Sequence, residues 1–223
     1  FTLSNRSAFP GVNCLLLVKN FEGHKSRNPS NKFAIHERTE NTIEAQNTLH
    51  VFPAGGHQPQ SQDYRNRKEH SIWRTAVREF LEELFDKEEL ARIHNGSEDF
   101  FEHPEVKPYI DAIFRFPRCA AVYFLGMGFD PLTTKPEILV SIVVDWERVA
   151  FAPDNPRLGH QSFEKDMEKN FEGGEVHFEE ATSDNLKKEA IEGRNGKPAL
   201  PAGAACMLLA SRPGFLEHML AMK

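Results

Sequence analysis

The sequence lacks any stretch long and apolar enough to span a membrane. The longest nearly apolar run, Ala120–Phe129, contains two glycines, whereas a membrane helix needs about 20 consecutive apolar residues. The mean hydropathy of −0.52 points the same way. We therefore expect a soluble, cytoplasmic protein that has no membrane contact.

Cysteine is scarce as well. Cys14, Cys119 and Cys206 are odd in number, lie far apart, and form neither a C-x-x-C pair nor a zinc-binding spacing. This usage predicts three reduced thiols, as in cytosolic proteins. No signal peptide is recognisable. The chain begins with Phe1 instead of Met, so we expect that an N-terminal domain precedes it in the whole protein.

An excess of positive charge is also missing. The 223 residues include 27 Lys and Arg against 33 Asp and Glu, a formal net charge of −6. A protein that binds polymeric nucleic acid through its charge needs the opposite sign, so that role is not expected for this domain. The length suits a single domain, residues 1–223, with a sizeable core.

Hydrophobic patterning predicts a mixture of strands and helices. Short apolar runs predict strands at 12–18, 33–36, 48–52, 120–125, 138–144 and 176–178, with a turn at 126–131. The clearest helix is capped by Ser71, and its apolar residues Trp73, Val77, Phe80 and Leu84 fall on one side. Pro201 opens a late helix, and a last short one follows at 215–222. This irregular mixture favours one α/β or α+β domain.

Three carboxylates share one turn of the helix that Ser71 caps. Glu79, Glu82 and Glu83 stand at positions i, i+3 and i+4, so they project from one side. A hard divalent cation such as Mg²⁺ or Mn²⁺ would relieve their repulsion, because it prefers carboxylate oxygens. The alternative is an ordinary solvated helix face, which is what most charge runs are.

The context of these glutamates resembles the Nudix box, G-x5-E-x7-R-E-U-x-E-E-x-G-U, where U is a bulky apolar residue. Gly56 stands for its first glycine, and residues 78–83 match R-E-U-x-E-E without a gap. The chain departs from the pattern elsewhere: twelve residues separate Gly56 from Glu69, Glu69 is one position too far from Arg78, and Phe85 replaces the closing glycine. The run at 126–133 also looks like a subgroup of bacterial Nudix-like proteins that often occur with helix-turn-helix domains.

The resemblance implies a Nudix-type α/β/α sandwich with a mixed sheet, acting as a metal-dependent hydrolase. Its substrate would be a small phosphorylated, nucleotide-derived ligand, a nucleoside diphosphate linked to another group. Glu79 and Glu83 would hold Mg²⁺ or Mn²⁺ with Glu82 sharing, a backbone carbonyl near Gly55 or Gly56 would complete the ligands, and Arg78 would orient the glutamates. A glutamate of the box or of a loop would be the general base.

Four further residues are candidates for contact with the substrate. Gly55, Gly56 and His57 follow the strand before the box, and Glu137 precedes a buried strand, where it is a candidate late metal ligand or base. The alternatives are an exposed loop histidine and an ordinary charge at a strand end. Tyr64, Arg65 and Arg67, in the enlarged loop, are equally compatible with contact to a phosphate or a base and with a solvated loop.

Two other functions stay open. A Nudix-like sensor would bind a nucleotide-derived ligand without turnover, as the altered loop and the missing glycine suggest. A protein-interaction domain that keeps only the fold is a weaker possibility. The complete set of box glutamates favours the enzyme. The sequence does not fix the substrate or the oligomeric state.

Overall fold

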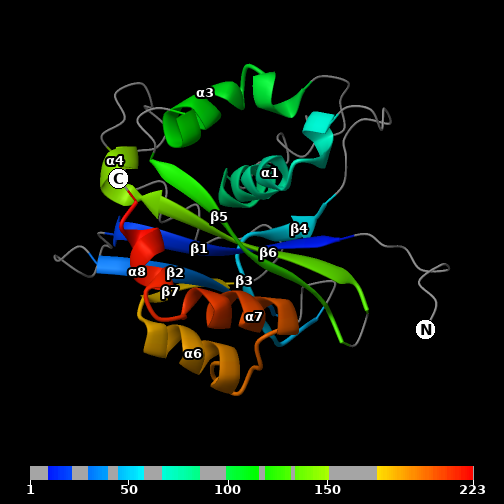
Figure 1. Cartoon of the computed structure of the whole chain (residues 1–223), viewed down its shortest axis with the longest axis vertical. Coiled ribbons are helices and arrows are strands. Elements are labelled where there is room, and N and C mark those ends of the chain that lie inside the picture. The colour runs from blue at the N-terminus through cyan, green and yellow to red at the C-terminus, as the bar shows by residue number, and fades with distance from the viewer. Residues whose placement is uncertain are drawn as a thin grey trace.

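The computed structural model describes residues 10–21, 30–39, 45–57, 67–85, 99–115, 119–131, 134–150 and 175–222. The protein is an α/β protein built on a mixed seven-stranded sheet (Figure 1). The strands are β1 (Gly11–Phe21), β2 (Ser30–Glu37), β3 (Leu49–Val51), β4 (Ala54–Gly56), β5 (Ala120–Phe129), β6 (Pro136–Asp145) and β7 (Glu175–Glu180). Each predicted strand is present, and the α/β expectation is confirmed.

Helices lie on both faces of the sheet, as Figure 1 shows. They are α1 (Ile72–Phe85), α3 (Lys107–Ile110), α4 (Trp146–Ala150), α6 (Ser183–Glu192), α7 (Pro201–Ala210) and α8 (Phe215–Leu220). Short 3-10 turns at Arg67–His70 and Phe100–Glu102 and a π-helical turn at Asp111–Arg115 accompany them. The predicted helix after Ser71 and the late helix opened by Pro201 are confirmed.

Strand β1 is the centre of the sheet. It pairs in parallel with β6 along nine residues, and its other edge pairs antiparallel with β4 and then with β2. The remaining ladders, β2 with β3 and β7 and β5 with β6, are antiparallel. At the N-terminal end of β1, the short strand β4 therefore takes the place that β2 holds further along.

Alternation along β1 and β6 separates two hydrophobic cores. Val12 and Ile138 belong to the core under α1, whereas Leu15 and Leu139 belong to the core under α7. Because paired residues in neighbouring strands share a face, the parity of a residue in β1 or β6 tells which layer its side chain faces. This parity places the functional side chains below.

Two expectations about strands are corrected. No strand was expected directly after the one predicted at 48–52, yet the next residues form β4 (Ala54–Gly56) by pairing with β1. The turn predicted at 126–131 is placed too early in the chain. Strand β5 continues through Gly126 and Gly128 to Phe129, with a bulge between Phe124 and Gly126. Pairing with β6 supplies the hydrogen bonds that extend β5 beyond its apolar run.

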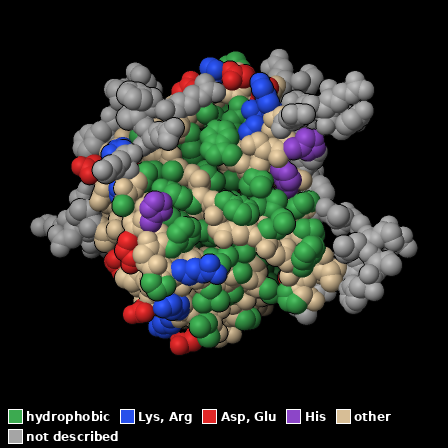
Figure 2. Space-filling model, in the orientation of Figure 1, with side chains coloured by type: hydrophobic (Ala, Val, Ile, Leu, Met, Phe, Trp, Pro, Cys, Tyr) green, Lys and Arg blue, Asp and Glu red, His purple; other side chains and the backbone are tan. Residues whose placement is uncertain are grey.

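Strand β5 ends the path of the main sheet and carries large apolar side chains in solvent. Phe124, Met127 and Phe129 are each more than half exposed. Figure 2 has the orientation of Figure 1 and shows apolar side chains gathered in the middle of this face, over strands β5 and β6. Within the described ranges, no helix is long and apolar enough to cross a bilayer. The acidic segment Lys87–His94, whose sequence allows a second short helix, lies outside those ranges.

Candidate active site on helix α1

Helix α1 is fixed firmly to the sheet. The Ser71 hydroxyl accepts a hydrogen bond from the Arg74 N–H at 3.4 Å, and the Ser71 carbonyl oxygen accepts one from the Thr75 N–H at 3.1 Å. The buried side of the helix packs over β1 and β4 and consists of Thr75, Ala76, Val77, Phe80 and Leu81. Trp73 was expected in the core, but it lies at the rim, 39% exposed, against Phe101. The carboxylates of α1 therefore project from a rigid element.

Glu79 lies directly against the backbone of β4. A Cβ added to Gly55 would lie 2.0 Å from Oε2 of Glu79 and 2.2 Å from its Cδ. A side chain at position 55 is therefore incompatible with this position of the carboxylate, which explains the glycine.

Glu83 contacts the neighbouring residue of the same strand. Its Oε1 accepts a hydrogen bond of 2.9 Å from the backbone N–H of Ala54. Glu79 and Glu83, one helical turn apart, thus meet consecutive residues of β4. The structure thus brings Glu79 and Glu83 of α1 against β4.

Arg78 links the glutamates to β4. Its Nη2 lies 2.7 Å from Oε1 of Glu79 and donates to the carbonyl oxygen of Gly56 at 3.3 Å, while its Nε lies 3.9 Å from Oε2 of Glu82. Arg78 is buried, so these charge-assisted contacts are shielded from water. The ion pairing that the resemblance implies for Arg78 is present.

Glu82 has a strongly shifted acidity. Burial, followed by the negative charge of Glu79, raises the pKa of its carboxyl to about 7, and Arg78 opposes the shift. Desolvation disfavours the ionised form, which is the physical cause. Near neutral pH this carboxyl therefore exchanges its proton readily, a property that active-site carboxyl groups share.

His57, directly after β4, lies beside helix α1. Its Nδ1 lies 2.7 Å from Oγ1 of Thr75, and its backbone N–H donates to the carbonyl oxygen of Pro10 at 2.8 Å. Burial, followed by the charge of Arg78, lowers the pKa of the imidazole. His57 is therefore an ordered neutral side chain beside α1, and not an exposed loop residue.

Glu137 lies on the other face of the sheet. It pairs with Gly11 across the parallel ladder, and a Cβ on Gly11 would lie 2.0 Å from Oε2 of Glu137. Gly11 and Glu137 have the parity of Leu15 and Leu139, which face α7. Gly55 pairs instead with Val12, on the α1 face. The structure therefore does not bring Glu137 together with Glu79, Glu82 and Glu83.

The α1 glutamates suit a hard divalent cation in type and place. All the donors are oxygens, and the absence of a side chain at Gly55 leaves room for the Glu79 carboxylate close to the backbone. Over the part of the chain that the structure describes, however, no three His, Cys, Asp or Glu side chains converge closely enough to hold a metal. The carboxylates of Glu79, Glu82 and Glu83 are present, but in this structure they are not arranged around a single metal position.

Three residues that contact the candidate site residues were not named by the sequence analysis. Thr75 precedes Glu79 by one helical turn, so helical spacing was a usable signal. Asn13, which donates a hydrogen bond to Glu137 on the opposite face of the sheet, is a polar residue inside an apolar strand, which is also a signal. Ala54 acts through its backbone, which the sequence does not report. Tyr64 and Arg65 lie outside the described residues.

Comparison with known proteins adds no relative. No family model matches the chain, and no curated protein and no solved structure matches it. The support for a function therefore comes from the residues themselves, above all from the seating of α1 on β4.

Proposed function

We propose that this chain is a divalent-metal-dependent hydrolase of the Nudix type that cleaves the diphosphate of a nucleoside diphosphate linked to another group. One observation carries the proposal: Glu79 lies on Gly55 while Glu83 accepts the N–H of Ala54. Two carboxylates from one helical turn are thereby held side by side against a glycine-containing strand.

The architecture supports the proposal. Helices on both faces of a mixed sheet are compatible with a Nudix-type α/β/α sandwich. The carboxylate helix α1 follows a strand that ends in two glycines, and the expected strands and late helix occupy the rest. The fold by itself does not assign an activity, so the proposal depends on the site.

Each residue of the site has a role in the proposed reaction. Glu79 and Glu83 would hold Mg²⁺ or Mn²⁺ with Glu82. When bound, the metal would offset the diphosphate charge and lower the pKa of a bound water. Arg78 keeps Glu79 in place and neutralises part of the cluster's charge. A cation bound there would favour the ionised form of Glu82, and a glutamate of the box or of a loop would be the general base.

One observation favours the second candidate, a Nudix-like sensor that binds a nucleotide-derived ligand without hydrolysis. In the described part of the chain the glutamates do not converge, and Glu79 is engaged by Arg78. A binding module needs charge balance and a rigid site but no assembled metal centre.

A hydrolysis assay separates the two candidates. The protein would be incubated with Mg²⁺ or Mn²⁺ and a panel of nucleoside triphosphates, dinucleoside polyphosphates, nucleotide sugars and dinucleotides, with product release measured. The hydrolase predicts turnover that falls at least about 100-fold in Glu83→Gln. Glu147→Gln, at an exposed position on α4, is the matched control and should keep full activity. Saturable binding of one compound without turnover would favour the sensor.

A further inference from the structure

The sheet face opposite α1 carries a cavity of about 370 Å³. Polar and charged residues that line it include Asn13, Arg38, His50, Lys135 and Glu137. Gly11 of β1 and Gly55 and Gly56 of β4 form part of its lining, and Glu137 of β6 lies beside them. The volume falls within the usual range for small-molecule pockets.

Glu137 is the central acidic group of this cavity. Its side chain is 12% exposed and rests over Gly11. Oε2 accepts a hydrogen bond of 2.7 Å from Nδ2 of Asn13, and Oε1 lies 3.8 Å from Nζ of Lys135. A positive and a negative group therefore stand next to each other at the cavity wall, and Asn13, itself buried, fixes the carboxylate.

The charges that line the cavity cancel. Arg38 and Lys135 are positive, Asp130 and Glu137 are negative, and burial keeps His50 neutral by lowering its pKa to about 3. A net anion or a net cation would leave one pair of these groups without compensation. A ligand that is neutral overall but carries two opposite charges close together complements them best.

The remaining wall distinguishes the two ends of such a ligand. Leu200, Pro201 and Ala202, at the start of the ten-residue helix α7, border the cavity, so its positive dipole end favours an anionic group there. His50 lines the same cavity, is 6% exposed, and its Nδ1 has no hydrogen-bond partner among the described residues. Such a buried polar atom normally has a partner.

We propose that this cavity binds a free α-amino acid with an aliphatic side chain. Its ammonium group would pair with Glu137, and its carboxylate with Lys135, Arg38 and the start of α7. The aliphatic side chain would contact Ala54, Leu200 and Ala202, which also line the cavity. The cavity shares Gly55 and Gly56 with the α1 site, but the charged groups proposed to bind the amino acid take no part in the proposed hydrolysis.

Calorimetric titration with L-leucine and its two halves tests the charge requirement. Isopentylamine carries the ammonium group without the carboxylate, and 4-methylpentanoate carries the carboxylate without the ammonium group. We expect L-leucine, L-valine or L-methionine to bind and to raise the melting temperature at about 10 mM, and each half to bind at least about tenfold more weakly. Equal binding of a half molecule, or no binding of any of the three amino acids, would overturn the proposal.

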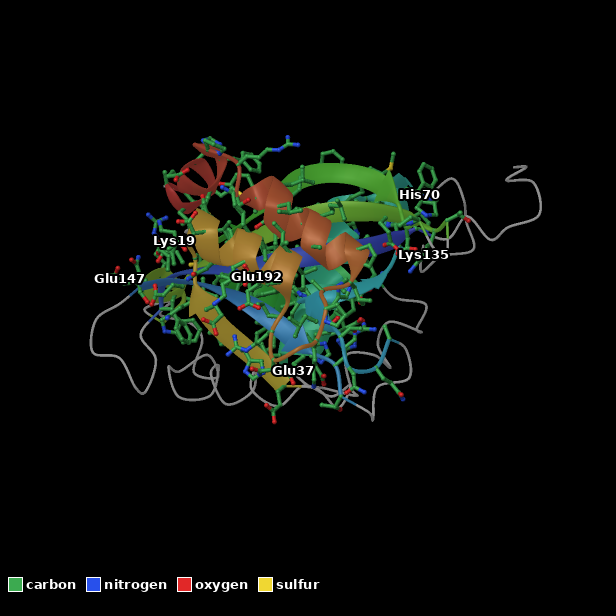
Figure 3. All side chains as sticks on the ribbon, turned by 90° about the horizontal axis from the view of Figure 1, so that it is seen from below. Lys19, Glu37, His70, Lys135, Glu147 and Glu192 are labelled. Atoms are coloured by element: carbon green, nitrogen blue, oxygen red, sulfur yellow. The ribbon has the colours of Figure 1, made fainter. Side chains whose placement is uncertain are left out.

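Variants locate the binding. Glu137→Gln keeps the shape but removes the charge and should weaken amino-acid binding at least about tenfold. Lys135→Gln, at an exposed position, should also weaken binding and serves if Glu137→Gln fails to fold by circular dichroism. Glu147→Gln is the control, since Figure 3 places Glu147 at the opposite end of the molecule from Lys135. Unchanged affinity in both cavity variants would refute the site, whatever the hydrolysis assay gives.

Discussion

The carboxylate of Glu79 occupies the space that a side chain on Gly55 would need. A Cβ on Gly55 would lie 2.0 Å from Oε2 of Glu79, well inside van der Waals contact. Glu79 in turn holds Nη2 of Arg78 at 2.7 Å, and the same guanidinium reaches the carbonyl oxygen of Gly56. Helix α1 and strand β4 are thus in direct contact through Glu79 and Gly55. A substitution at position 55 tests whether this contact is needed.

Gly55→Ala should displace Glu79 from β4. We expect the free energy of unfolding to fall by less than about 1 kcal/mol, because the methyl group meets only the carboxylate end of the Glu79 side chain, which can move away. Mn²⁺ affinity and any hydrolysis should fall at least about tenfold, since a misplaced ligand loses its geometry. Denaturant unfolding and Mn²⁺ titration measure the two effects.

Gly128→Ala is the matched control for that substitution. Gly128 also lies in a strand, but a Cβ there would meet nothing within 4 Å. Its stability and metal affinity should stay close to wild type. Equal effects of the two substitutions would mean that the Glu79–Gly55 contact has no special importance.

Arg78→Lys should weaken metal binding even though it keeps the positive charge. Arg78 contacts Glu79, Glu82 and the carbonyl oxygen of Gly56 at once, and an ammonium group cannot reproduce this fork. We expect Mn²⁺ affinity to fall about tenfold or more. Arg148→Lys, in α4, tests the same exchange away from the site. Unchanged Mn²⁺ binding in Arg78→Lys would show that Arg78 does not position the glutamates.

The sequence predicted the elements whose signal is local. Helix α1 could be located because a cap and an apolar stripe both mark it, and β1 because its apolar run is nearly continuous. Strand β4 could not, because Ala54–Gly56 becomes a strand only by pairing with β1, a contact between residues far apart in the chain. The extension of β5 through Gly126 and Gly128 likewise comes from its pairing with β6.

The members of the α1 cluster could be predicted, because helical spacing alone puts Glu79, Glu82 and Glu83 on one turn. The position of Glu137 could not. Its face depends on the register between β1 and β6, and a shift of one residue would turn it toward α1. The sequence therefore grouped Glu137 with a site that lies on the other side of the sheet.

Glu82→Gln should change the pH dependence of stability. The pKa of Glu82 is raised to about 7 in the folded protein against an ordinary value near 4.5. Between these values the native state binds more protons than the unfolded state, so wild-type stability falls as pH rises, by up to about 1.4 kcal/mol per pH unit. The variant has no carboxyl group at position 82 to protonate, so this pH dependence is absent. The free energy of unfolding of the variant, measured by urea unfolding, should therefore rise relative to that of the wild type from pH 5 to pH 8. Parallel curves would contradict a buried, neutral Glu82.

His36 and His50 predict the opposite dependence at acid pH. Burial lowers their pKa values to about 4 and about 3, from an ordinary value of 6.5. Both are neutral in the folded protein, whereas the unfolded chain takes up protons below pH 6.5. Stability supplied by the neutral native state is therefore complete above pH 6.5 and is lost as pH falls, by up to about 1.4 kcal/mol per pH unit for each histidine.

His50→Gln isolates one of these two contributions. The variant cannot be protonated, so its free energy of unfolding should fall less steeply than that of the wild type between pH 6.5 and pH 4, whatever its stability at pH 7. His218→Gln, at an exposed position on α8, measures what the loss of an imidazole outside the core does to the same curve. The difference between the His50→Gln and wild-type curves cancels the titration of the carboxylates, which affects both proteins equally. A constant difference across this range would mean that His50 is protonated as easily in the folded protein as in the unfolded chain.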